Sequence, residues 1–87
     1  MAKVYYSEYF RKRLRILNTK QQAKLARLVV LLGNNPYHPQ LHTKFLSGEL
    51  AGLYSFRVSR DLRVLFKFLS PDELMLTDIG FRKDIYK

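Results

Sequence analysis

Residues 54–68 read YSFRVSRDLRVLFKF, and this stretch decides the fold because apolar and polar side chains alternate along it. A period of two is typical of strands with one buried face. The alternation breaks at residues 59–61, which predicts two strands, 54–58 and 62–69, joined by a three-residue loop. That loop gathers the alternating apolar side chains on one face and places Arg57 directly opposite Arg63 on the other, whereas a two-residue loop would mix the faces.

A third strand follows the hairpin. Ser70, Pro71 and Asp72 supply turn chemistry, and residues 73–79 have the composition of a strand. Gly80 is expected to end this strand, which leaves residues 81–87 as a short basic tail.

The N-terminal half predicts a strand and two helices. Residues 2–6 are rich in Val and Tyr, and Ser7 can cap a helix that begins directly after it. Thr19 and Gln22 form a capping-box signature for a second helix, which Gly33 can end at its C′ position. Apolar residues at helical spacing give each helix a buried stripe, at Phe10, Leu14 and Leu17 in the first and at Leu25, Leu28, Val29 and Leu32 in the second.

The order of these elements predicts an α+β fold. The N-terminal strand and the two-helix hairpin are expected to pack on one face of a small antiparallel sheet, while the other face stays partly open. Residues 34–52, with two prolines and two histidines, are expected to be irregular. A chain of 87 residues has room for one hydrophobic core, so we expect a single domain over residues 1–87.

Charge is the most informative global property. Sixteen Lys and Arg against seven Asp and Glu give a net charge of +9, which favours a nucleic acid, an anionic membrane surface or an acidic protein as partner. The longest apolar stretch, residues 28–32, is far shorter than the roughly 20 residues that span a bilayer. Charges interrupt the N-terminus before a secretory signal develops, and the chain has no cysteine, so we expect a cytoplasmic protein without disulfides.

The opposed arginines are a candidate anion site. Two like charges directly opposite in a sheet repel, so an anion between Arg57 and Arg63 would stabilise the pair, and a phosphate suits the guanidinium fork. The alternative is two solvated arginines with carboxylate neighbours. Other basic residues could reach the same face, namely Lys44, Lys67, Arg82 and Lys83.

Three motifs in this order resemble the RelE/ParE toxin superfamily. They are GLYSFRV at residues 52–58, DLRVLF at 61–66 and IGFRKDIY at 79–86, and the N-terminal helical hairpin and the overall length also agree. The resemblance implies a microbial-ribonuclease-like fold. In RelE members it further implies cleavage of mRNA in the ribosomal A site, with no metal or other cofactor.

The resemblance also implies site residues. Arg57 and Arg63 match the two strand arginines, Arg82 the arginine after the last strand, and Tyr86 the terminal tyrosine, so these four are the expected catalytic residues. Arginines would stabilise the charge on pentavalent phosphorus while another group moves protons. The expected RNA-binding residues are Lys44, Lys67, Phe81 and Lys83.

One position departs from the family pattern. Many relatives carry histidine where this chain has Phe81, which cannot transfer a proton. Phe81 could stack on a base or be a core residue. Two alternatives to a nuclease therefore stay open: a ParE-like protein that poisons DNA gyrase, and a silent relative that only binds RNA or its partner. The basic set of Arg57, Arg63 and Arg82 favours the nuclease, with mRNA, the ribosome and an acidic antitoxin as partners.

Other candidate groups have weaker support. His38 and His42 stand four apart, but Pro36 and Pro39 disfavour the helix that would align them, so we expect no metal site. Glu49 or Asp78 could act as a general base. The strand parity of Asp78 is ambiguous, and a salt bridge with Arg63 or Arg82 is the other interpretation.

Overall fold

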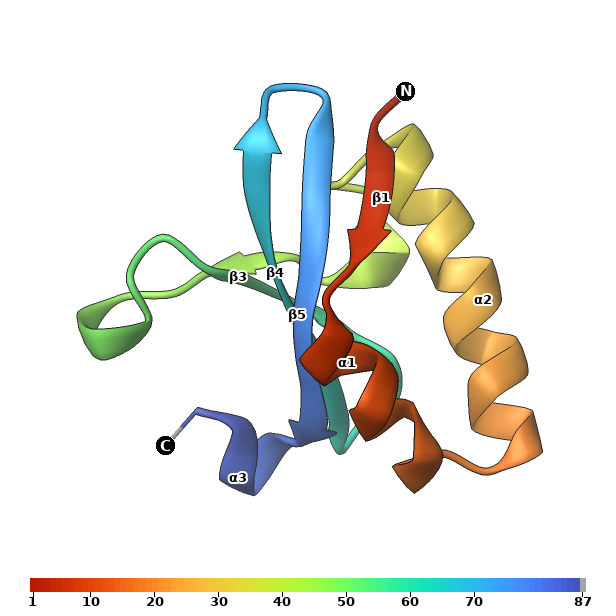
Figure 1. The fold of residues 1–87 in the computed structure, drawn as a ribbon. Helices are drawn as coiled ribbons and strands as arrows, with labels where there is room; N and C mark the ends of the chain where they lie inside the picture. Colours follow the sequence, from red (N-terminus) through yellow and green to blue (C-terminus); the bar gives the residue numbers. More distant parts are fainter. Residues whose placement is uncertain (87) are drawn as a thin grey trace.

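One mixed sheet of five strands organises the computed structural model, in which residues 1–86 are described (Figure 1). Its order is β1-β5-β4-β3-β2, and the strands are β1 Lys3–Tyr6, β2 Lys44–Phe45, β3 Tyr54–Arg57, β4 Leu62–Ser70 and β5 Glu73–Phe81. The α+β class is confirmed. The predicted three-strand meander is antiparallel, but the N-terminal strand does not pack on that sheet: β1 joins its edge by pairing with β5 in parallel, so the whole sheet is mixed. This pairing joins segments near the two ends of the chain, so no local sequence pattern predicts it.

The central hairpin has the predicted register. Arg57 pairs with Arg63, and the Val58 amide donates to the Leu62 carbonyl at 2.9 Å across residues 59–61. Five of the alternating apolar side chains are at most 1% exposed, as the face assignment requires; they are Phe56, Val58, Leu62, Val64 and Phe66. Tyr54 and Phe68, at the outer ends of the two strands, are partly buried against the same core. The three-residue loop is confirmed.

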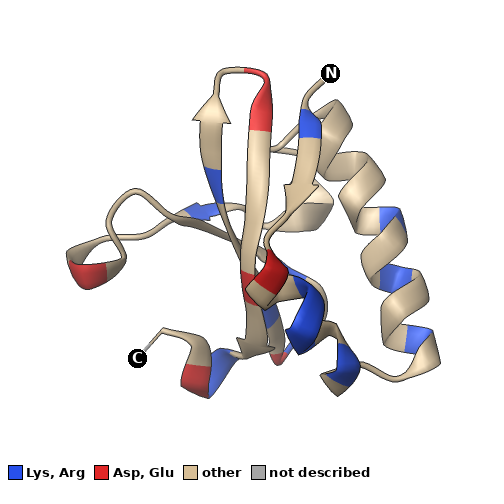
Figure 2. Ribbon diagram, in the orientation of Figure 1, with Lys and Arg blue, Asp and Glu red and all other residues tan. Residues whose placement is uncertain are grey.

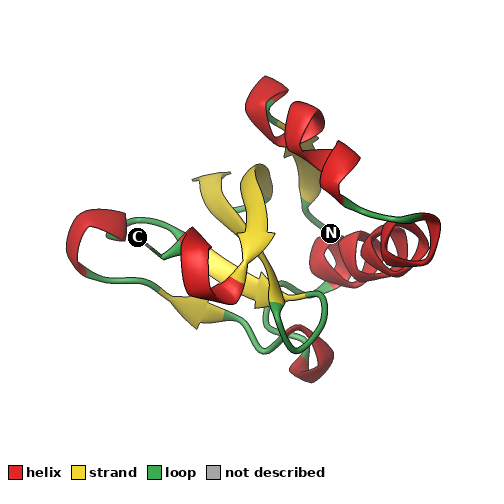
Figure 3. Ribbon diagram, turned by 90° about the horizontal axis from the view of Figure 1, so that it is seen from below, coloured by secondary structure: helices red, strands yellow, loops and turns green. Residues whose placement is uncertain are grey.

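Two helices cover the core face of the sheet. α1 spans Glu8–Arg13 and continues as a 3₁₀ turn over Leu14–Ile16, and α2 spans Thr19–Asn34. Seen from below in Figure 3, α2 lies to one side of the strands. The predicted stripe of α2 is buried in the main core at Leu25, Leu28 and Leu32. The predicted cap of α1 is confirmed, since the Phe10 amide donates to Ser7 Oγ at 3.0 Å.

The capping box of α2 lies one residue earlier than predicted. Asn18 has extended backbone angles, and its Oδ1 accepts from the Gln21 amide at 2.8 Å. The Gln21 side chain accepts in turn from the Asn18 amide at 3.0 Å. Asn is a better N-cap than Thr, which is why Thr19 becomes the first helical residue instead.

We expect Asn18→Ala to lower the free energy of unfolding by about 1 kcal/mol, because an orphan amide of the first turn loses its acceptor. The matched control is Thr19→Ala, whose hydroxyl caps nothing and whose effect should be within about 0.5 kcal/mol. Urea denaturation of both variants measures this. A larger loss in Thr19→Ala would restore the capping box predicted from the sequence.

Gly33 lies inside α2 instead of ending it. The helix comes close to β1 here, because the Ala2 amide donates to the Gly33 carbonyl at 2.7 Å. A Cβ at position 33 would lie 3.2 Å from the Ala2 carbonyl oxygen. The glycine therefore permits a close approach of helix and strand.

A β-bulge resolves the ambiguous parity of β5. Leu65 pairs with Asp78 but Phe66 pairs with Leu76, so Thr77 is an extra residue in β5. The extra residue switches the strand's alternation between Leu76 and Ile79, and both are fully buried.

Asp78 pairs with a residue that the sequence did not single out. Its Oδ1 lies 3.6 Å from Arg13 Nε, so the expected salt bridge with Arg63 or Arg82 is wrong. The Arg13 guanidinium also donates to the Ile79 carbonyl at 3.2 Å. Arg13 of α1 therefore contacts the edge of β5 at Ile79, beyond the residues of β5 that pair with β1. No local sequence pattern predicts this contact.

The C-terminal segment is folded back onto the sheet. β5 continues through Gly80 to Phe81, and α3 spans Arg82–Ile85, where a basic tail was expected. Ile85 is buried in a second, smaller apolar cluster on the other face, with Leu46 and Leu65. That face is therefore covered at one end. Within residues 1–86, no helix has the length and apolar character needed to cross a membrane.

Candidate nucleic-acid interface

Strand pairing gathers basic residues on the sheet face away from the main core. Lys44 of β2 pairs with Ser55 of β3, and Arg57, two residues further along β3, pairs with Arg63. Directly opposite residues and residues two apart share a face. Lys44, Ser55, Arg57 and Arg63 therefore form two neighbouring rows on one face.

Tyr86, the residue directly after α3, reaches this face. Its hydroxyl lies 3.1 Å from Ser55 Oγ and can donate to it, although 31 residues separate the two in sequence. Ser55 is 2% exposed, so the contact fixes the phenol over β3. The phenol oxygen thus lies beside Ser55, which is two residues from Arg57 along β3 and directly opposite Lys44 of β2.

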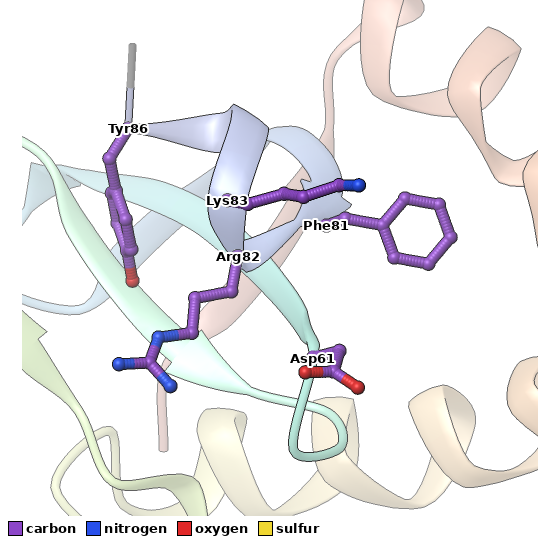
Figure 4. Close-up of a pocket in the computed structure, with 5 residues that line it drawn as sticks. All are labelled: Asp61, Phe81, Arg82, Lys83 and Tyr86. Carbon is purple, nitrogen blue, oxygen red and sulfur yellow. The ribbon is translucent and has the colours of Figure 1, made fainter.

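Arg82 lines a cleft between α3 and the β3–β4 loop. The cleft has a volume of about 680 Å³ and is lined by Asp61, Phe81, Arg82, Lys83 and Tyr86. The Arg82 amide donates to the Asp61 carbonyl at 2.6 Å, which ties the start of α3 to the loop. In Figure 4 the side chains of Arg82 and Tyr86 extend one way from α3, and those of Phe81 and Lys83 extend another. The cleft thus has a side with the tyrosine and a side with the phenylalanine.

Phe81 is not a core residue. Its side chain is 48% exposed at the cleft, in contrast to Phe10, Phe56 and Phe66 at 0%. An exposed aromatic ring beside basic groups can stack on an unpaired base.

Arg63 differs from the other predicted site residues. It is 7% exposed, and its Nη1 donates to the carbonyls of Ser59 at 2.7 Å and Arg60 at 2.9 Å. Its guanidinium therefore closes the hairpin loop, and these carbonyl dipoles offset the repulsion from Arg57. An anion bridging the two arginines is not needed. Arg57 is exposed and forms no salt bridge within residues 1–86.

Lys67 lies outside the group. It is exposed on the same face, four residues beyond Arg63 along β4, which is roughly 13 Å at the rise of a strand. Of the predicted site residues, the structure brings Lys44, Arg57 and Tyr86 together on this face. Arg82, Lys83 and Phe81 line the adjoining cleft, and Phe81, which pairs with Leu62, lies toward the core face of the sheet.

Asp61 is a residue that the sequence analysis did not single out. It supplies the carboxylate of the cleft, and its place at the end of the hairpin loop, directly before β4, was the available signal. The two carboxylates proposed earlier lie elsewhere: Asp78 is held by Arg13, and Glu49 lies on a 3₁₀ turn, Gly48–Leu50.

His38 takes part in the local backbone structure. His38 Nδ1 accepts from the Gln40 amide at 3.1 Å and caps a 3₁₀ turn, Pro39–Leu41. No group of three potential ligands among His, Asp and Glu lies together in residues 1–86.

This arrangement of sheet and helices is the fold of the RelE-like toxins. YafQ from E. coli strain BL21(DE3) superposes with a TM-score of 0.80 at 22% identity, over 100% of both chains. A chain of the toxin–antitoxin complex RelBE2 from Mycobacterium tuberculosis gives 0.79 at 22% identity, over 93% of this chain and 98% of that one. The YoeB/ParE toxin from Agrobacterium tumefaciens gives 0.76 at 17%, over 92% and 98%.

A chain of the E. coli DinJ–YafQ complex superposes with a TM-score of 0.78 at 22% identity, over 100% of both chains. No protein-family model and no curated protein sequence matches this chain. At these identities the likeness establishes the fold alone.

Proposed function

We propose that this chain is the toxin of a toxin–antitoxin pair and that it cleaves mRNA on the ribosome. The observation that carries the proposal is the convergence at one sheet face of Tyr86, Arg57 and Lys44, with Arg82 in the adjoining cleft. These residues come from β2, β3 and the α3 segment, so the fold brings together parts of the chain that are far apart in sequence. The net charge of +9 supports a polyanionic substrate.

The chemistry is an attack of the RNA 2′-hydroxyl on the adjacent phosphate. A bond forms from the 2′-oxygen to phosphorus and the bond to the 5′-oxygen breaks, which leaves a 2′,3′-cyclic phosphate and a 5′-hydroxyl. The guanidinium groups of Arg57 and Arg82 stabilise the added charge on the phosphoryl oxygens. Asp61 accepts the 2′ proton, and the Tyr86 hydroxyl gives a proton to the leaving oxygen.

The second side of the cleft holds the RNA next to the reacting phosphate. Phe81 stacks on an unpaired base, and Lys83 neutralises a neighbouring phosphate. Because the proton is carried by Asp61 and Tyr86 in this scheme, the chain does not need the histidine that many relatives have at position 81.

The partner that silences the toxin is an acidic antitoxin. The RelE-like neighbours from M. tuberculosis and E. coli were solved as toxin–antitoxin complexes. A basic interface attracts a segment rich in carboxylates, which blocks the cleft when it binds.

Expression of this chain alone in bacteria should stop protein synthesis, because cleavage of mRNA on the ribosome removes the template. The measurement is the incorporation of labelled methionine after induction, with DNA supercoiling followed in parallel. Co-expression of the adjacent small gene should restore growth. Normal incorporation together with trapped gyrase–DNA complexes would mean a ParE-like poison, and no change in either would mean a silent relative.

A further inference from the structure

A second basic pocket lies beside the same β3–β4 loop, between the loop, α2 and the Pro39–Leu41 turn. Its volume is about 390 Å³, and its lining residues are Lys24, Arg27, Leu28, Gln40, His42, Arg57, Val58, Ser59 and Arg60. α2 carries three basic residues and no acidic one, which Figure 2 shows as blue bands without red.

The charges of this pocket are uncompensated. Lys24, Arg27, Arg57 and Arg60 line it, and no Asp or Glu does. The salt bridges formed within residues 1–86 join Lys12 to Glu8 and Arg13 to Asp78, so they involve none of these four residues. Four cations around one concavity attract an anion strongly, because their fields add.

His42 adds a hydrogen-bond donor to the lining of the pocket. His42 has φ 50° and ψ 45°, and it is the one residue other than glycine with positive φ in residues 1–86. Glycine adopts this conformation without cost, but the chain has an imidazole here, and this residue lines the pocket. His42 closes the Pro39–Leu41 turn, where its amide donates to the Pro39 carbonyl, and histidine is among the residues that adopt this conformation more readily than most. The turn thus places the imidazole at the pocket, where a ring N–H can donate to an anion.

Arg57 joins the pocket to the proposed site. It lines the pocket, and it also lies in the row next to Ser55, which holds Tyr86. An anion in the pocket is therefore adjacent to the face where the scissile phosphate would lie. A continuous RNA strand supplies phosphates at both positions, and arginine forks match phosphate oxygens.

We propose that this pocket binds a backbone phosphate of the RNA, at a nucleotide flanking the one that is cleaved. The inference rests on the proposed function and adds to it a positioning site that sets the register of the RNA. The competing occupant is a carboxylate of the antitoxin, which the experiment must separate from RNA.

The probe is a fluorescent hexauridylate with 2′-O-methyl at every position, which lacks the attacking hydroxyl and stays intact. The full chain is compared with Lys24→Ala/Arg27→Ala and with the control Arg11→Ala/Lys20→Ala, which removes the same charge from exposed positions outside the pocket. Anisotropy gives Kd as a function of salt. All four side chains are exposed, so both double variants should melt near the temperature of the wild type.

The pocket variant should raise Kd about tenfold and lower the salt slope by about 0.7, the loss of one phosphate contact on a single strand. The control should change Kd less than about threefold. Equal losses in both variants would overturn the inference, as would no measurable binding by the wild type at low salt. Unchanged RNA binding with weakened antitoxin binding would assign the pocket to the antitoxin. If the pocket variant alone loses RNA while wild-type expression leaves translation intact, the pocket stands and the nuclease proposal falls.

Discussion

Replacing Arg82 by alanine is expected to slow RNA cleavage by about a hundred- to a thousandfold, the usual cost of losing one group that stabilises transition-state charge. Arg82 is exposed in the cleft, and its structural contact is a backbone amide that alanine keeps. The melting temperature should therefore stay unchanged. Cleavage of a defined mRNA in a purified translation system measures the rate.

Two further variants test whether the effect of Arg82→Ala is specific to the site. Arg57→Ala should lose activity to a similar degree without losing stability, since Arg57 is exposed and forms no salt bridge in residues 1–86. Arg11→Ala, on the outer surface of α1, should retain full activity. A wild-type rate in Arg82→Ala would remove the cleft beside α3 from the site.

The parts of the fold that follow a local period could be predicted from the sequence. The alternation predicts the hairpin register to the residue, and it places Arg57 directly opposite Arg63, as in the structure. The cap at Ser7 follows equally from local chemistry. Such features depend on a few side chains that are close together in the chain, so a single sequence is enough to predict them.

The parts that depend on distant segments could not be predicted. The pairing of β1 with β5 joins the chain ends, and β2 has two residues, too few to show a period. The bulge at Thr77 interrupts the alternation of β5. α3 is stabilised by Ile85 in a cluster built from other elements, so its four residues have no helical pattern of their own.

The site shows the same division. Strand parity placed Arg63 on the correct face, but parity says nothing about exposure. The guanidinium of Arg63 is buried because it donates to the carbonyls of Ser59 and Arg60, and these carbonyls point at it only in the folded hairpin. For the same reason the basic pocket at Lys24 and Arg27 was invisible, since it exists only where α2 meets the loop.

Arg63→Ala is expected to lower stability and activity together, unlike Arg57→Ala. The substitution removes Nη1 from the carbonyls of Ser59, Arg60 and Leu62 in a part-buried site. The Ser59 and Leu62 carbonyls keep backbone amide donors, whereas the Arg60 carbonyl loses its donor. Losing hydrogen bonds from a charged group costs about 2 kcal/mol, and in a domain of this size that lowers the melting temperature by about 10 °C. Calorimetry and the cleavage assay measure the two effects on the same samples.

The physical reason that activity falls as well lies in the loop. Residues 59–61 carry Asp61 into the cleft and hold the start of α3 through the Asp61 carbonyl. Without the hydrogen bonds from Arg63, the loop no longer holds the Asp61 carboxylate and the start of α3 in place. A misplacement of about 1 Å is enough to lower the rate a hundredfold. Loss of activity with an unchanged melting temperature would instead mean that Arg63 contacts the RNA directly, as the resemblance to RelE implies. A role in holding the loop predicts a lower melting temperature for Arg63→Ala, and a role in direct RNA contact predicts an unchanged one. The melting temperature therefore distinguishes the two roles of this arginine.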